Sequence, residues 1–159
     1  MSAQRPMPDP ELASKLAADL FGQGFNCAEA VVQALLWDDE NASTVGQRMA
    51  TAFGGGTARR GGTCGALQGA AMALSYLAGR TRADDDEGKE RAYALVGELF
   101  HRVAASRGSV ECRTLTGLDF TEPESHDRFD AEVKERVCVP LVREVARLAA
   151  QALAPARTS

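Results

Sequence analysis

The sequence predicts an all-α protein, folded as one compact bundle of about six helices. Three observations predict this class. Apolar residues recur at helical spacing through most of the 159 residues, capping residues precede these segments, and no alternating apolar and polar run flanked by turns indicates a strand. The composition, 45% apolar and 25% charged, is that of a globular domain. We therefore expect a single domain over residues 1–159, with its core at about 12–150 and frayed ends.

Two helices are predicted near the start of the chain from their capping residues. Asp9 stands before Pro10, a pair that favours a helix start, and the two glycines of residues 22–24 should end this helix. Asn26 is followed three residues later by Glu29, which is the pattern of a capping box. This pattern predicts a second helix over about residues 27–37.

The third and fourth helices flank a glycine-rich loop. Thr44 is expected to start the third helix, in which Val45 and Met49 share a face, and the helix should end at the loop. After the loop, a fourth helix is predicted over residues 63–78, and Gly79 is a suitable stop for it.

The second half of the chain is predicted to be helical as well. Three consecutive aspartates, Asp84 to Asp86, favour the start of a long helix that Gly108 ends. Its expected buried face consists of Tyr93, Val96, Phe100 and Val103. A short turn is expected at residues 112–116. One helix should then carry Phe129, Val133 and Val137, and Pro140 should open or kink the last one.

The charge and the hydropathy of the chain exclude several functions. The net charge of −4 gives no reason to expect nucleic acid or an acidic membrane surface as a partner. The uncharged stretch at residues 61–79 is too short and too weakly apolar for a membrane span, so no membrane insertion is expected. The first residues, MSAQRPMPDPELAS, lack the apolar core of a signal peptide. We therefore expect a cytoplasmic protein.

The four cysteines are Cys27, Cys64, Cys112 and Cys138, and they are the main candidates for chemistry. None belongs to a Cys-x-x-Cys pair, so the thioredoxin and common zinc-finger spacings are absent. All four are predicted at or near helix starts, where free backbone N–H groups lower a thiol pKa and stabilise anionic sulfur. This placement suggests one shared four-cysteine site. The competing interpretation is that each cysteine is a small buried hydrophobic residue.

The glycine loop, FGGGTARRGGTCGALQGA at residues 53–70, superficially resembles a phosphate-binding loop. It lacks the lysine that such a loop requires, and a helix rather than a strand precedes it. We instead expect its glycines to let the backbone pass close to the site of Cys64, and we assign the contacts around this site to Gly55, Gly56, Gly62 and Gly65.

The order of these motifs resembles a known family. A lone cysteine in GFNCAEAVVQAL is followed by FGGG and GGTCGALQGA, by ECRTLTGLDF, and by a last cysteine in RVCVPLV. Together these are similar to the C_GCAxxG_C_C family of redox-active proteins, over roughly residues 12–150. The resemblance implies a small helical protein whose Cys27, Cys64, Cys112 and Cys138 work together in redox or metal chemistry. Thr57 and Ala58 depart from the more usual Met and Gly of the family.

Three functions remain open from the sequence. A similar domain is associated with split-Soret cytochromes, which implies an iron–sulfur cluster on four thiolates, most simply a two-iron cluster for electron transfer or redox sensing. The absence of Cys-x-x-Cys-His excludes covalent c-type haem. The second function is metal-free thiol–disulfide oxidoreduction, with Cys64 as the redox thiolate, and the third is a structural zinc site in an interaction module. The redox partner is unknown, and apolar helix faces would allow a homodimer.

Overall fold

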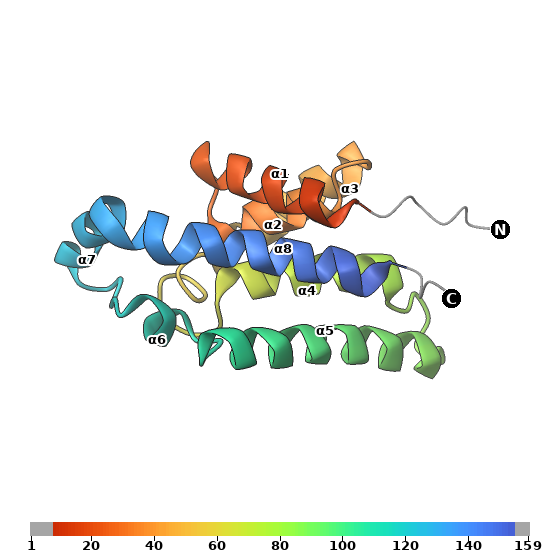
Figure 1. The fold of residues 1–159 in the computed structure, drawn as a ribbon. Coiled ribbons are helices and arrows are strands. Elements are labelled where there is room, and N and C mark those ends of the chain that lie inside the picture. The colour runs from red at the N-terminus through yellow and green to blue at the C-terminus, as the bar shows by residue number, and fades with distance from the viewer. Residues whose placement is uncertain (1–7, 155–159) are drawn as a thin grey trace.

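The computed structural model describes residues 8–154, and these are helical over most of their length (Figure 1). The elements are α1 (Pro10–Gly22), α2 (Cys27–Leu35), α3 (Glu40–Ala50), the 3-10 turn η1 (Thr51–Phe53), α4 (Gly65–Ala78), α5 (Asp86–Arg107), α6 (Cys112–Thr116), α7 (Pro123–Arg128), the π-helix η2 (Phe129–Cys138) and α8 (Val139–Leu153). No strand occurs within this range, which confirms the all-α prediction. The expected frayed ends fall partly outside the described residues.

Capping side chains fix the starts of the first helices. The Asp9 side chain accepts hydrogen bonds from the first turn of α1, and both halves of the capping box join Asn26 and Glu29 at the start of α2. The predicted start of the third helix at Thr44 is wrong. Helix α3 begins at Glu40, because the Asp39 side chain accepts from the backbone N–H of Ala42 and caps the helix earlier.

The core is built from small side chains that let the helices approach closely. Helix α1 packs on α8 and α2, α2 packs on α4, and α4 also contacts α5 and α8. Many fully buried positions are alanines, namely Ala13, Ala17, Ala28, Ala66, Ala70, Ala73, Ala146 and Ala149. A Cβ atom on Gly69 would lie 2.3 Å from the carbonyl oxygen of Ala28, so the contact of α4 with α2 requires glycine at this position.

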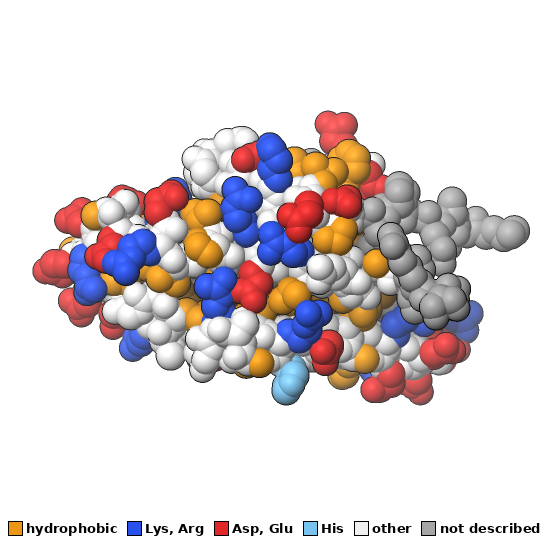
Figure 2. All heavy atoms as spheres, in the orientation of Figure 1, with side chains coloured by type: hydrophobic (Ala, Val, Ile, Leu, Met, Phe, Trp, Pro, Cys, Tyr) orange, Lys and Arg blue, Asp and Glu red, His pale blue; other side chains and the backbone are white. Residues whose placement is uncertain are grey.

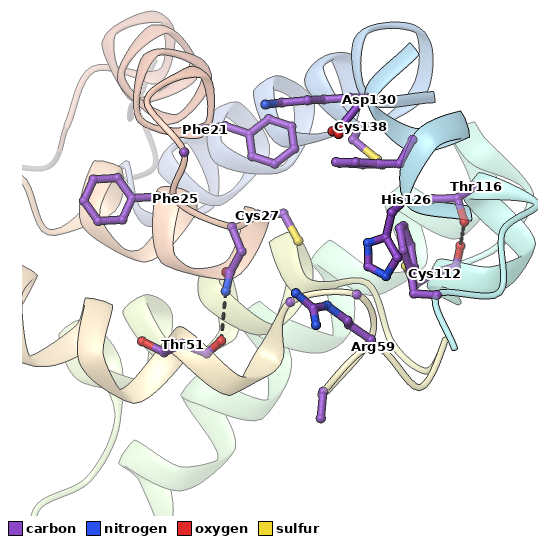
Figure 3. Close-up of a pocket in the computed structure, with 18 of the residues that line it drawn as sticks. Phe21, Phe25, Cys27, Thr51, Arg59, Cys112, Thr116, His126, Asp130 and Cys138 are labelled. Carbon is purple, nitrogen blue, oxygen red and sulfur yellow. Dashed lines mark hydrogen bonds between the residues drawn. The ribbon is translucent and has the colours of Figure 1, made fainter. Parts of the chain in front are cut away.

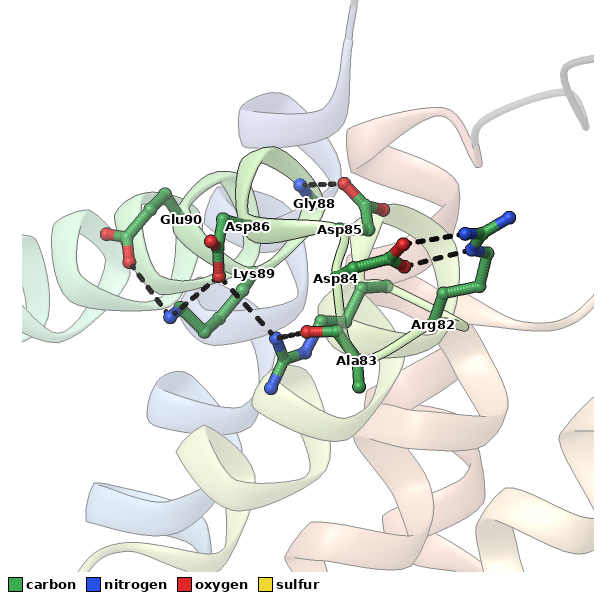
Figure 4. Close-up of polar contacts among 9 residues, drawn as sticks. Arg82, Ala83, Asp84, Asp85, Asp86, Gly88, Lys89 and Glu90 are labelled. Atoms are coloured by element: carbon green, nitrogen blue, oxygen red, sulfur yellow. Dashed lines mark hydrogen bonds and ion pairs between the residues drawn. The ribbon is translucent and has the colours of Figure 1, made fainter.

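The long helix α5 starts where the three aspartates predict. The Asp85 side chain accepts from the backbone N–H of Gly88, while Asp84 pairs with Arg82 and Asp86 with Lys89 (Figure 4). These capping and pairing contacts explain the acidic run without a bound cation.

The predicted buried face of α5 is only partly right. Val103 and the neighbouring Leu99 are buried, whereas Tyr93 is 69% exposed, and Val96 and Phe100 are half-buried. The face turned toward α4 and α8 uses Ala92 and Leu99, so the apolar stripe that contains Tyr93 lies to one side of the core contact.

The last part of the described chain is one continuous helical run rather than two separate helices. Helix α7 leads directly into η2, and η2 into α8. The backbone N–H of Val139 donates to the carbonyl oxygen of Lys134, five residues back, which is the hydrogen bond of a π-helix. Pro140 lies in the first turn of α8, after this wider stretch, and does not separate the two elements.

The surface over α8 and α5 carries charges of both signs (Figure 2). Arg107 on α5 pairs with Glu144 on α8, and Arg147 on α8 pairs with Glu11 on α1. Within residues 8–154, no helix is long and apolar enough to cross a membrane.

Candidate four-cysteine site

A cavity of about 550 Å³ lies at the end of the bundle where α2 begins and where α6 and α7 are found (Figures 1 and 3). Cys27, Cys112 and Cys138 line it, and Cys64 is buried at the start of α4. The structure therefore brings cysteines from four distant segments to one end of the molecule. The sequence separations alone did not establish this convergence.

The four thiols interact with one another electrostatically. Every pair among Cys27, Cys64, Cys112 and Cys138 contributes to the pKa of at least one of its members. All four are free thiols. In the described part of the chain, however, no group of three or more Cys, His, Asp or Glu side chains is placed so that it could hold a metal ion. The sulfurs thus lie at the same end of the bundle without forming a coordination shell.

Three of the four cysteines lie at helix starts, as the sequence predicts. Cys27 is the first residue of α2, Cys64 is the N-cap of α4, and Cys112 is the first residue of α6. Cys138 is the N-cap of α8, but its own backbone is helical as well. This residue ends η2 and continues directly into α8, so no free helix N-terminus is present there.

Burial outweighs the effect of the helix starts on the thiols. Desolvation raises the pKa of Cys27 to about 12 and the pKa values of Cys64 and Cys112 to about 11. It also raises the pKa of Cys138, and the other three thiols raise it further. The expected lowering is present as a smaller contribution, because the backbone N–H groups of Ala66 and Leu67 favour the Cys64 thiolate. Without a metal, the four thiols are therefore neutral at physiological pH.

The glycine loop is tied by its backbone to the segment that carries Cys112. The N–H of Cys112 donates to the carbonyl oxygen of Gly62 at 2.7 Å, and the N–H of Arg113 donates to that of Gly61 at 3.2 Å. These bonds place two cysteine-bearing segments side by side. The loop therefore positions the site through its backbone, which agrees with the interpretation based on the sequence.

Two of the four glycines assigned to the site, Gly56 and Gly65, lie very close to cysteine side chains. Gly62 accepts the hydrogen bond from Cys112 through its carbonyl group. A Cβ atom on Gly65 would lie 2.5 Å from the Sγ of Cys27, and one on Gly56 would lie 2.8 Å from the Cβ of Cys112. Gly55 lines the cavity and has a φ of 65°, in the left-handed region that favours glycine.

Three consecutive residues of the loop adopt this left-handed backbone without being glycine. Thr57, Ala58 and Arg59 have φ values of 65°, 50° and 62°. Such a conformation costs roughly 1–2 kcal/mol per residue for residues that carry a Cβ. The backbone hydrogen bonds from Ala58 to Ala52 and from Arg59 to Gly54 hold the turn in place. Strain of this kind is found where the surrounding structure requires a particular side-chain position.

Sequence reasoning missed several residues that line the cavity. Arg59 and His126 lie near Cys27 and Cys112, with the guanidinium group of Arg59 directed into the cavity (Figure 3). Phe120 packs edge-on against His126, with ring centroids 5.9 Å apart. Nothing in the local sequence indicates that Phe120 and His126 line the cavity, because they reach it only through the folding of the chain.

Lys134 is a further residue of the cavity, and the sequence contains a signal for it. It precedes Cys138 by four residues, a spacing that places two side chains of a helix on similar faces. Its charge lowers the pKa of Cys138 in part, and its Nζ lies 5.0 Å from the ring centroid of Phe21.

The buried carboxylate of Glu29 stabilises the start of α2, where Cys27 faces the cavity. Glu29 is 8% exposed and accepts hydrogen bonds from the N–H of Asn26, from Gln47 and from the hydroxyl of Thr51. These bonds join the start of α2 to the end of α3 and the turn η1, from which the glycine loop departs. Glu29 therefore links Cys27 to the loop of Cys64.

The comparison with known proteins finds one family. A family model described as "Putative redox-active protein (C_GCAxxG_C_C)" matches residues 25–152. No curated protein and no solved structure was found to match the chain. The matched region covers most of the chain and includes all four cysteines. The protein belongs to the C_GCAxxG_C_C family of redox-active proteins.

Proposed function

We propose that Cys27, Cys64, Cys112 and Cys138 hold an iron–sulfur cluster, of the two-iron type, for electron transfer or redox sensing. One observation carries the proposal. Four free thiols from distant segments come to one end of the bundle, where three of them line one cavity and Cys64 is buried at the start of α4. The family to which the chain belongs is described as redox-active, which supports the same assignment.

The residues present suit such a cluster in their chemistry. Four cysteine thiolates are the usual ligands of two-iron and four-iron clusters. Glycine at positions 56 and 65 lets the backbone approach Cys112 and Cys27 more closely than a residue with a Cβ atom could. We assign only the identity of the ligands, because the described side chains form no coordination shell as they stand.

The surrounding residues support charged sulfur in several ways. Backbone N–H groups of Ala66 and Leu67 stabilise the Cys64 thiolate, and the hydroxyl of Thr116 stabilises that of Cys112. Such hydrogen bonds to sulfur and the exclusion of water are two of the features that set a cluster's reduction potential. When bound, an iron–sulfur cluster accepts and donates single electrons. The buried thiols must lose their protons to bind it, so binding releases protons.

The first test is made on protein purified without oxygen. A visible spectrum is recorded, and iron, sulfide and zinc are measured on the same sample. Brown protein with matched iron and sulfide is expected. Colourless protein with stoichiometric zinc would replace the cluster by a zinc site, and chelation that removes the zinc but leaves the fold and thermal midpoint unchanged would exclude a folding role for it.

Protein without any metal would instead favour thiol–disulfide chemistry at Cys64. That chemistry needs a thiolate near neutral pH, whereas burial raises the pKa of this thiol to about 11. The raised pKa of the Cys64 thiol therefore counts against this second function.

Variants then test the ligand set. Cys64→Ser is expected to abolish or strongly alter the visible spectrum, and the same applies to each of the other three cysteines. Val45→Ser serves as the control, because Val45 is an exposed residue of α3 that does not line the cavity. An unchanged spectrum in Cys64→Ser would remove Cys64 from the ligand set.

A further inference from the structure

Arg59 brings a positive charge to the cavity. Its guanidinium group is directed into the cavity near Cys27 (Figure 3), and within residues 8–154 it forms no hydrogen bond or ion pair. The next residue, Arg60, is equally exposed but does not line the cavity. Two adjacent arginines of the same loop thus differ in their position relative to the cysteines.

Lys134 brings a second positive charge to the same cavity from a different element, η2. Its ammonium group lies over the ring of Phe21, and no carboxylate within the described range forms an ion pair with it. Asp130 is the one acidic residue among the described residues that line the cavity, so the cations exceed the carboxylates there.

A four-thiolate metal site requires such charges. A divalent metal ion on four thiolates retains two net negative charges, and at a partly buried site these are costly unless cations or N–H groups face them. We propose that Arg59 and Lys134 stabilise the negative charge of the four-thiolate centre, as positioning residues that do not themselves bind the metal. This inference rests on the proposed function, since it requires the thiolates to be gathered around a metal.

The strained turn agrees with this role. Thr57, Ala58 and Arg59 are all in the left-handed region, and this turn carries the Arg59 side chain toward the cavity. A turn that served only to connect α3 with α4 would be better formed by glycine at these positions. Residues with a Cβ atom disfavour this left-handed backbone. The placement of the Arg59 side chain at the cavity explains why the loop adopts it.

The test uses Co²⁺ as the probe on the full-length, reduced, metal-free chain. The sulfur-to-cobalt absorption reports binding to thiolates and yields an affinity. Arg59→Ala and Lys134→Ala are each expected to weaken Co²⁺ binding by about tenfold, as is typical when a residue next to a metal site is removed. Arg60→Ala is expected to bind as the wild type does. High salt should reduce the effect of Arg59→Ala, because exposed charges are screened.

Two further variants separate charge from structure. Arg59→Lys keeps the charge and is expected to restore most of the affinity. Arg59→Gly removes both the charge and the backbone strain, so it should bind Co²⁺ as weakly as Arg59→Ala while unfolding at a higher urea concentration.

The failures of the two proposals are distinguishable. If the wild type binds Co²⁺ and Arg59→Ala and Lys134→Ala bind it equally well, or if Arg60→Ala loses as much affinity, the inference is overturned and the metal site stands. If Arg59→Gly binds as the wild type does, the charge of Arg59 has no role. If the wild type shows no thiolate binding of Co²⁺, the metal site is refuted, and the inference with it.

Discussion

The amide N–H of Cys64 donates a 2.8 Å hydrogen bond to the carbonyl oxygen of Val110. This bond joins the start of α4 to the segment that leads into α6. Together with the bond from Cys112 to Gly62, it fixes two of the four cysteines relative to each other through the backbone. The relative position of these two segments therefore does not depend on what the thiols bind, and the variants below can be studied in metal-free protein.

Gly65→Ala is predicted to destabilise the protein, because the new Cβ would lie 2.5 Å from the Sγ of Cys27 and 2.7 Å from the carbonyl oxygen of Phe53. The expected loss is about 1–3 kcal/mol in the free energy of unfolding, measured by urea titration. Gly97→Ala is the matched control in α5. Nothing lies within 4 Å of its new Cβ, so it should gain about 0.5–1 kcal/mol. Equal stabilities for the two variants would contradict the close approach at Gly65.

Glu29→Ala is predicted to destabilise the protein by about 1–3 kcal/mol, because the half-buried N–H of Asn26 loses its acceptor and the Thr51 hydroxyl keeps only the carbonyl oxygen of Gln47. Glu29→Gln keeps one acceptor oxygen and should lose less. Glu98→Ala, at an exposed position of α5, is the control and should be close to neutral. Urea unfolding provides the measurement. A neutral Glu29→Ala would show that these donors reach water.

Thr57→Gly is predicted to stabilise the protein, because a β-branched residue with a φ of 65° is strained and glycine is not. After the entropy of the more flexible unfolded chain is subtracted, a gain of about 0.5–1 kcal/mol is expected in thermal or urea unfolding. Thr81→Gly is the control, since Thr81 is exposed and does not have a positive φ. It should be destabilised. A loss in both variants would refute strain at Thr57.

Alkylation of the metal-free protein by iodoacetamide is predicted to be slow near neutral pH. Burial raises the pKa of Cys64 and Cys112 to about 11, from an ordinary 9.0, so at pH 8 the thiolate population is about 100-fold smaller than in an unfolded chain. Mass spectrometry of each cysteine peptide gives the rates, and urea-unfolded protein is the reference. Rapid labelling of Cys64 at neutral pH would instead support thiol–disulfide chemistry.

The stability of the metal-free protein is predicted to fall in alkaline solution. The folded thiol pKa values exceed the unfolded value of 9.0, so their contribution is complete below pH 9 and is lost as the pH rises toward about 11 or 12. The urea midpoint is measured at intervals between pH 8 and 10. Cys112→Ala removes one such thiol and should show a shallower decline than the wild type. An identical decline would assign the effect to other groups.

Most of the helices could be predicted from the sequence, because caps and apolar spacing act over a few residues. The Asn26–Glu29 capping box and the start of α5 at the aspartates are examples. The start of α3 was misplaced because Asp39 and Thr44 are both suitable caps, and the contacts of the folded chain select Asp39. The face of Tyr93 was misassigned because α5 has apolar residues on more than one side.

The sequence by itself determined the all-α class, the family and the four candidate cysteines, since these follow from local pattern and motif order. Only the tertiary structure decided that the four thiols share one end of the bundle. The fold decided as well that burial raises their pKa values by more than the helix starts lower them. It also decided that Arg59, rather than Arg60, faces the cavity. The physical reason is that desolvation and charge interactions depend on distances between segments far apart in the chain, which local spacing does not set.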